Sequence, residues 1–220
     1  MNILINITSY NRKEMLLNLI GQLKGFDIKV WDDHSDFRIE YLLKWDNKTT
    51  FYQFQKNHGK KLAWKKFNFI FENIPKGYDY YIFLPDDIEV VEDFIFKAVD
   101  LWESIQDENK ISLSFSDFKR TKQPNWTQFN SVDFGNYIQT QWLDMMFICE
   151  PRFFELVKLT EVCQSRWKIN SLLGSGVGSK ISNHFHKLGM GMYNTKENLT
   201  KHLGNKKSLM NPKERKKNKL

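Results

Sequence analysis

Four strand-length apolar runs alternate with helical patterns in the first hundred residues, and this alternation constrains the fold most strongly. The runs occupy residues 2–7, 27–31, 49–54 and 78–84. Apolar residues recur at helical spacing over 12–24 and 59–73, and a short helix is expected near 38–44. Parallel strands need crossovers of helix length, so the pattern predicts an α/β fold with a mostly parallel central sheet flanked by helices. The chain has 220 residues, which fits a single domain.

The second half is less regular. A helix is predicted over 92–105, and strands are predicted over 111–115 and near 141–149. Between these strands, residues 117–137 are polar and aromatic with no clear period, which indicates an ordered insertion or lid. Further helices are expected from Pro151 and over 179–188.

Each of the four predicted strands is followed by polar residues. The fourth strand runs directly into Asp86 and Asp87, and the others are followed by the segments TSYNR, DDHSD and NHGKK. In parallel sheets, ligands bind beyond the carboxyl ends of the strands. Adjacent carboxylates there suit Mg²⁺ or Mn²⁺, which take one or two carboxylates and fill their other positions with water and phosphate oxygens. An ordinary acidic turn would explain one such loop, but four at one edge favour a ligand site.

TSYNR (8–12), WDDHSD (31–36), NHGKKLAW (57–64) and LPDD (84–87) together resemble the nucleotide-sugar domain of GT-A fold, family-2-like glycosyltransferases. The resemblance covers residues 1–100 well and the remainder more loosely. It implies a Rossmann-like domain whose residues 1–100 bind a nucleotide diphosphate sugar, usually a UDP-sugar. Residues 101–200 would bind the acceptor, and 201–220 would form a basic tail or flap.

The resemblance also implies roles for single residues around the donor. The base and ribose pocket would be lined by Thr8, Tyr10 and Arg12, which follow the first strand. Asp32 or Asp33, after the second strand, would bind the base or the ribose. Three residues after the third strand would lie near the nucleotide and its phosphates: Asn57, Gly59 and Lys60. Asp86 and Asp87 stand where the family has Asp-X-Asp, with Asp86 beside the nucleotide sugar and Asp87 as the firmer metal ligand.

The chain departs from the family pattern at several positions. His34 stands where the second motif usually has Gly, the Asp-X-Asp motif is shortened, and Asn68 follows Ala63 at a stretched spacing. The late Glu-Asp pair of inverting members is replaced by GSGVGSKISNHFHKLG (174–189). An inverting transfer needs a base for the acceptor hydroxyl. Asp144 is the first candidate and Glu150 the second, while a retaining transfer would need neither.

The C-terminal segment carries a further candidate site. In the family, a downstream His often completes the metal or diphosphate site, which implies His202 as the second metal ligand. Imidazole suits Mn²⁺ better than Mg²⁺. Lys206, Ser208 and Arg215 would then close over the diphosphate as a flap.

The net charge of +7 lies in the last twenty residues, which hold eight Lys and Arg and one acid. This favours a polyanionic partner, although a solvated tail explains it equally well. Our first hypothesis for the acceptor is a hydroxymethylated base in double-stranded phage DNA, held by the tail and by aromatic residues of the insertion. The alternatives are a saccharide or lipid-linked saccharide, and a non-catalytic nucleic-acid-binding protein.

Three features bear on location. No apolar run approaches the length of a membrane span, and the N-terminus lacks the pattern of a signal peptide. Cys149 and Cys163 are isolated, which favours a reducing compartment. We therefore expect a cytoplasmic protein, in the host cytoplasm if it is viral.

Overall fold

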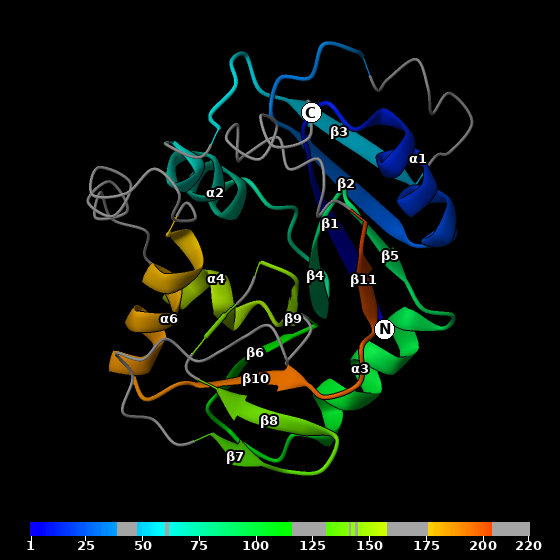
Figure 1. Ribbon diagram of the computed structural model, residues 1–220. Helices are drawn as coiled ribbons and strands as arrows, with labels where there is room; N and C mark the ends of the chain where they lie inside the picture. Colours follow the sequence, from blue (N-terminus) through cyan, green and yellow to red (C-terminus); the bar gives the residue numbers. More distant parts are fainter. Residues whose placement is uncertain are drawn as a thin grey trace, which may run out of the picture.

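The computed structural model describes residues 1–38, 48–59, 62–115, 131–140, 142–143, 145–157 and 176–203. These residues form an α/β fold with a central mixed, largely parallel sheet between helices (Figure 1). The helices are α1 (Lys13–Gln22), α2 (Ala63–Glu72), α3 (Phe94–Ser104), α4 (Arg152–Leu156) and α6 (Val177–Lys187). The predicted fold class is confirmed.

The sheet has nine strands in the order β3-β2-β1-β4-β9-β6-β10-β8-β7. In chain order they are β1 (Ile3–Ser9), β2 (Asp27–Asp32), β3 (Thr49–Gln53), β4 (Tyr80–Pro85), β6 (Lys110–Ser114), β7 (Val132–Asp133), β8 (Tyr137–Thr140), β9 (Phe147–Cys149) and β10 (Gly191–Thr195). A separate two-stranded ribbon pairs β5 (Ile88–Val90) with β11 (Thr200–His202).

The chain changes direction across the sheet at β1. It proceeds from β1 to β2 and β3 on one side, and then returns to place β4 on the other side of β1. Strands β3, β2, β1 and β4 are parallel, with Thr8 of β1 opposite Trp31 of β2 and Pro85 of β4. The carboxyl ends of β1 and β4 therefore meet at a topological switch point, where ligands bind in open α/β sheets.

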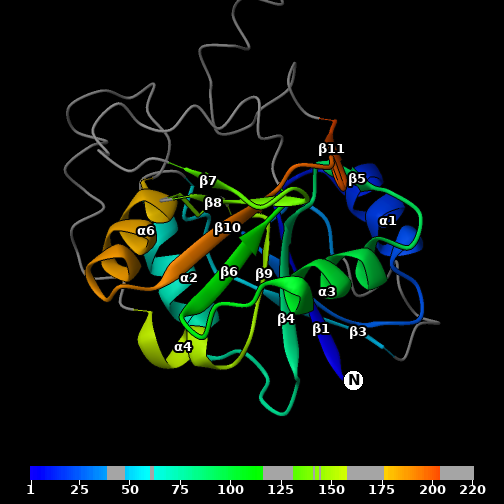
Figure 2. The same ribbon diagram turned by 90° about the horizontal axis from the view of Figure 1, so that it is seen from below.

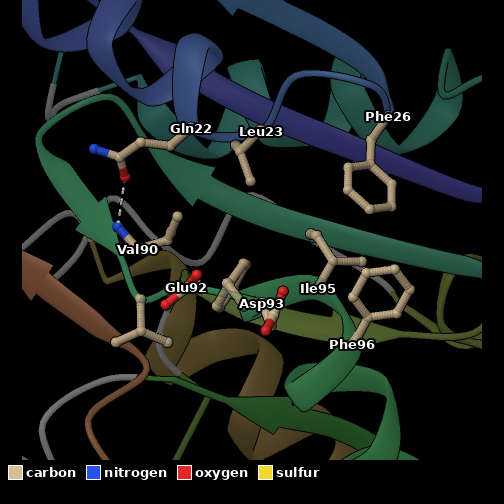
Figure 3. A pocket seen from close by; sticks show the side chains of 10 residues that line it. Gln22, Leu23, Phe26, Val90, Glu92, Asp93, Ile95 and Phe96 are labelled. Carbon is tan, nitrogen blue, oxygen red and sulfur yellow. Dashed lines mark hydrogen bonds between the residues drawn. The ribbon is translucent and has the colours of Figure 1, made fainter.

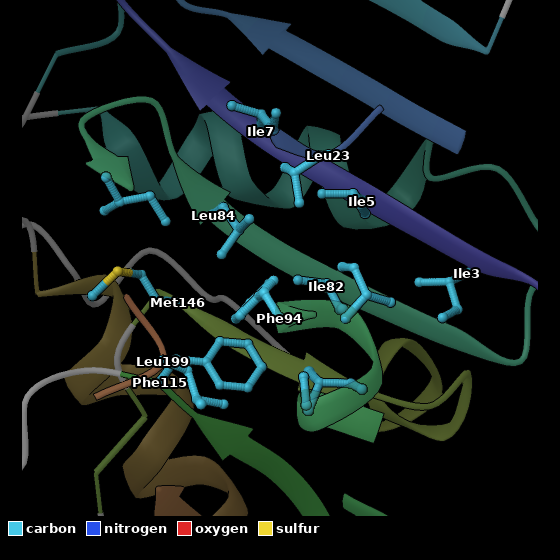
Figure 4. Close-up of a cluster of buried hydrophobic side chains, with 14 of the residues drawn as sticks. Ile3, Ile5, Ile7, Leu23, Ile82, Leu84, Phe94, Phe115, Met146 and Leu199 are labelled. Carbon is cyan, nitrogen blue, oxygen red and sulfur yellow. The ribbon is translucent and has the colours of Figure 1, made fainter. Parts of the chain in front are cut away.

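Helices cover both faces of the sheet (Figure 2). One core packs α1 and α3 against β1, β4 and their neighbours through residues such as Leu19, Ile82 and Trp102; Figure 4 shows part of it. The other core packs α2, α4 and α6 against the opposite face and is rich in aromatic rings, among them the stacked pair Phe83 and Phe147. Both faces are buried, which explains why β1 and β4 are almost continuously apolar.

The second half differs from the sequence expectation. Within the strand predicted near 141–149, only Phe147–Cys149 form a strand among the described residues, and it runs antiparallel between β4 and β6. The end of the predicted insertion contributes β7 and the start of β8. Strands β5, β10 and β11 were not predicted, and the helix predicted near 38–44 lies almost entirely outside the described residues.

Gly178 allows α6 to pack directly against the backbone of Leu143. A Cβ at this position would lie 2.5 Å from the Leu143 carbonyl oxygen. Two hydrogen bonds through Ser182 hold Leu143 against α6. The Leu143 N–H donates to Ser182 Oγ, and the Ser182 hydroxyl donates to the Gly178 carbonyl. Backbone atoms cannot yield as a side chain can. We expect Gly178→Ala to lower the free energy of unfolding by about 1–3 kcal/mol in urea denaturation.

Gly21 is the matched control, because it lies in α1 with nothing within 4 Å of a Cβ built on it. Gly21→Ala should raise the free energy of unfolding by about 0.4–1 kcal/mol, since alanine restricts the unfolded chain. A Gly178→Ala protein as stable as the wild type would contradict the close packing of α6.

Candidate functional site

The carboxyl ends of β1 and β4 are joined by hydrogen bonds through Asp86. Its Oδ2 accepts from Ser9 Oγ and from the Tyr10 N–H, both at 3.0 Å. The backbone adds a further bond, because the Asp86 N–H donates to the Thr8 carbonyl at 3.0 Å. Asp86 is 1% exposed. It therefore fixes the loop after β1 against the loop after β4.

Arg12 lies between the two adjacent carboxylates. Its Nη1 is 2.8 Å from Asp86 Oδ1 and 3.0 Å from Asp87 Oδ2. Arg12 immediately precedes α1, so the end of β1 and the start of this helix together determine its position. Burial raises the pKa of Asp86, and the nearby Arg12 guanidinium opposes that rise.

The β5–β11 ribbon brings His202 to Asp87. His202 pairs with Ile88, the residue after Asp87, and the Leu203 N–H donates to the Asp87 carbonyl at 2.8 Å. As a result, His202 Nδ1 lies 3.8 Å from Asp87 Oδ2. The His202 side chain is 38% exposed, whereas that of Asp87 is 7% exposed. The two residues predicted as metal ligands are therefore neighbours, although they are far apart in the sequence.

Asp32, which ends β2, is fully buried, and its carboxylate accepts hydrogen bonds from neighbouring residues of the protein. It accepts from the Ser35 N–H at 2.8 Å, from the Ser35 hydroxyl, and from Gln53 Nε2 at 3.0 Å. These bonds shape the loop after β2 and tie it to the end of β3. With 0% exposure, Asp32 has no surface for a nucleobase in this conformation.

Asp33 joins the loop after β3 to the site. Its Oδ1 accepts from the His58 N–H at 2.9 Å, and its Oδ2 from the Gly59 N–H at 3.2 Å. Lys66 Nζ lies 3.4 Å from Oδ2, and the backbone carbonyl of Asp33 accepts from Asn57 Nδ2 at 3.0 Å. Asp33 is 2% exposed, so its carboxylate, like that of Asp32, bonds to other residues of the protein.

The remaining donor-site residues lie around this edge. Thr8, Tyr10 and Gly59 are half-buried, and Asn57 is exposed. His34 adopts φ 68°, in the left-handed region that favours glycine. Its ring Nδ1 lies 3.1 Å from the Phe54 carbonyl oxygen.

Glu150 does not lie near the carboxylate pair. Strand β9 runs antiparallel to β4, and Cys149 is opposite Tyr81 near the start of β4. Glu150 therefore lies near the amino-terminal end of β4, roughly 20 Å along the strand from Asp86 at its carboxyl end. There its Oε1 accepts from Trp102 Nε1 at 2.9 Å. This position does not support Glu150 as the second candidate base.

Several predicted site residues lie outside the described residues: Lys60, Asp144, Lys206, Ser208 and Arg215. Conversely, Ser9 and Lys66 take part in the network and were not predicted. Lys66 is 8% exposed on the buried side of α2. A charged residue on the apolar face of a helix needs a buried partner, and this sequence signal could have identified Lys66.

A cavity of about 340 Å³ lies between the end of α1, the end of β5 and the start of α3 (Figure 3). Its walls include Leu23 and Ile95, and the Phe26 and Phe96 rings meet edge to face at 6.1 Å. Gln22 Oε1 accepts from the Val90 N–H at 2.9 Å. None of the predicted site residues lines this cavity.

The residues around Asp87 fit a divalent cation that brings most of its own ligands. No three His, Cys, Asp or Glu side chains converge on a metal position within the described parts of the chain. However, Asp87 Oδ1 makes no hydrogen bond to any described residue, and His202 adds a ring nitrogen nearby. Mg²⁺ and Mn²⁺ commonly use one or two protein ligands and complete their shells with water and substrate phosphates.

Comparisons with known proteins give limited information. No family model matches the chain, and no curated protein matches it in sequence. Among solved structures, it is similar to the apo form of the glycosyltransferase GlyE of Streptococcus pneumoniae TIGR4, with 12% identity and a TM-score of 0.46. The match covers 87% of this chain and 45% of that one, so the chain spans less than half the length of GlyE. Within the described residues, no helix is long and apolar enough to cross a membrane.

Proposed function

We propose that the chain is a glycosyltransferase that binds a nucleotide diphosphate sugar, preferably a UDP-sugar, at the β1–β4 switch point. The observation that carries the proposal is the position of Asp87 and His202, whose side chains lie 3.8 Å apart beside the carboxyl ends of β1 and β4. A carboxylate whose Oδ1 makes no hydrogen bond within the described part of the chain, together with an exposed imidazole, suits Mn²⁺ or Mg²⁺ accompanied by a diphosphate.

Each residue of the site has a specific task in this proposal. Asp87 and His202 would hold the cation, which neutralises charge on the leaving diphosphate when bound. Asp86 holds the loop after β1 in place by accepting from Ser9 and Tyr10. Tyr10 and Thr8 border the nucleotide side of the site. Asp32 and Asp33 contribute by fixing the loops after β2 and β3, rather than by direct contact with the base.

For the acceptor, we propose a hydroxymethylated base in double-stranded DNA, with Asp144 as the base if the transfer is inverting. Lys and Arg residues concentrated in 201–220 begin directly at the β5–β11 ribbon, so the tail starts beside Asp87. Phosphates of DNA would pair with this charge. A hexose and a pentose are both compatible with the proposal.

A saccharide acceptor is the second candidate, and the aromatic pair of the β7–β8 hairpin is compatible with either acceptor. Phe134 is 50% exposed and stacks on Tyr137 at 5.3 Å between ring centroids. Exposed aromatic rings provide a flat apolar face on which a sugar ring or a flipped base can stack.

The test is transfer from a labelled UDP-sugar with Mn²⁺, using DNA that contains 5-hydroxymethylcytosine and the same DNA with cytosine as the matched control. We expect label on the hydroxymethylated DNA alone. Hydrolysis or donor binding without transfer to DNA would retain the glycosyltransferase and move the acceptor to saccharides. DNA binding with no nucleotide binding would contradict the proposal and favour a non-catalytic nucleic-acid-binding protein.

A further inference from the structure

A positive charge of the chain itself lies against the carboxylate pair. Both Asp86 and Asp87 are almost without solvent exposure, at 1% and 5%. Charges removed from water need a partner. That partner is Arg12, whose Nη1 bonds to Asp86 Oδ1 and Asp87 Oδ2 at once. The position that a cation would neutralise is therefore already beside a positive charge.

The two carboxylates differ in how many of their oxygens already have polar partners. Asp86 has both oxygens occupied, by Arg12 on one side and by Ser9 and Tyr10 on the other. Among the described residues, the close side-chain partner of Asp87 is Arg12, whose Nη1 forms an ion pair with Oδ2 at 3.0 Å, and His202 lies 3.8 Å away. A cation at Asp87 would thus share this carboxylate with the guanidinium. Two positive charges at one carboxylate repel each other, and in a site with little solvent this repulsion is poorly screened.

We propose that Arg12 is a resident counter-ion that weakens binding of a free divalent cation at Asp87 and makes cation uptake depend on the nucleotide diphosphate. The inference rests on the proposed function, because it assumes a diphosphate at this site. A diphosphate adds negative charge that both the cation and the guanidinium can face, and guanidinium groups pair well with phosphate. The repulsion that opposes the free cation is then offset, and cation and nucleotide bind together.

The test measures Mn²⁺ binding directly, by electron paramagnetic resonance of free Mn²⁺, with and without UDP. Wild-type protein should bind Mn²⁺ alone weakly and bind it much more tightly with UDP. Arg12→Gln should bind Mn²⁺ alone about tenfold more tightly, because one opposing charge is removed, and its enhancement by UDP should shrink correspondingly.

Lys201→Gln is the matched control. It removes the same charge one residue from His202, but Lys201 is exposed and pairs with Glu89 at 3.3 Å. Its Mn²⁺ affinity should equal that of the wild type. If both variants tighten Mn²⁺ binding equally, the effect is one of net charge and the counter-ion inference is wrong.

Arg12→Gln leaves Asp86 buried without its cation, which can prevent folding. The second comparison therefore uses Asp86→Asn with and without Arg12→Gln, because asparagine removes one of the two buried carboxylates that Arg12 faces. The double variant should bind Mn²⁺ alone more tightly than Asp86→Asn. Equal affinities, or no Mn²⁺ binding by any variant, would overturn the inference. Tighter Mn²⁺ binding without any binding of UDP would support Arg12 as counter-ion and contradict the proposed function.

Discussion

Replacement of Asp87 by asparagine is expected to reduce sugar transfer by about a hundredfold or more while the protein remains folded. Asparagine keeps the size of the side chain but removes the charge that would hold a divalent cation beside the diphosphate. Losing one preorganised electrostatic contact of this kind typically costs about 10²–10³ in rate. The measurement is the initial rate with saturating donor and Mn²⁺, together with circular dichroism to establish folding.

Glu89→Gln is the control for this change. Glu89 lies on β5, two residues after Asp87, and its carboxylate pairs with exposed Lys201. An exposed pair of this type contributes little to stability, so the variant should transfer sugar at the wild-type rate. If Asp87→Asn retained full activity, the assignment of Asp87 as the metal ligand would be wrong.

The second large effect is expected at Asp33, on stability rather than on catalysis. Asp33 is 2% exposed and accepts from His58, Gly59 and Lys66. Asp33→Ala would leave the Lys66 ammonium buried without its partner. Breaking a buried ion pair at one side typically costs about 3–5 kcal/mol, so a shift of this size in the free energy of unfolding is expected in urea denaturation.

Two further variants separate this role from direct nucleotide binding. Asp36→Ala alters an exposed carboxylate of the same loop, which accepts from Asn11, and should change the unfolding free energy by no more than about 1 kcal/mol. Adding Lys66→Met to Asp33→Ala removes the orphaned ammonium and should restore part of the stability. Unchanged stability of Asp33→Ala, accompanied by loss of nucleotide binding, would instead place Asp33 in the nucleotide pocket.

The first half of the fold was predictable from the sequence because its signals are local. Apolar runs alternate with helical patterns, and polar residues follow each strand, so β1 to β4 and the site edge could be placed without tertiary information. The second half could not, because its strands are short. Three apolar residues at 147–149 do not indicate whether a strand is parallel or antiparallel, and that direction determines where Glu150 lies.

In the site, too, some features could be predicted from the sequence and others could not. The positions of Asp86 and Asp87 after β4 followed from the sequence, and the resemblance placed His202 beside Asp87, where the ribbon puts it. The partners of the charged groups did not follow. Whether Asp32 faces a ligand or its own loop depends on Ser35 and Gln53, and the bridge from Arg12 to both carboxylates depends on how β1 meets β4. Such contacts join segments that are distant in sequence.

The most direct test of the proposed site is the anomalous difference map of crystals soaked with Mn²⁺ and UDP. We predict one Mn²⁺ peak within ligand distance of Asp87 and His202, with the UDP diphosphate on the same ion and the uridine beyond the end of β1. UDP and Mn²⁺ bound elsewhere, or absent from the β1–β4 switch point at saturating concentrations, would contradict it.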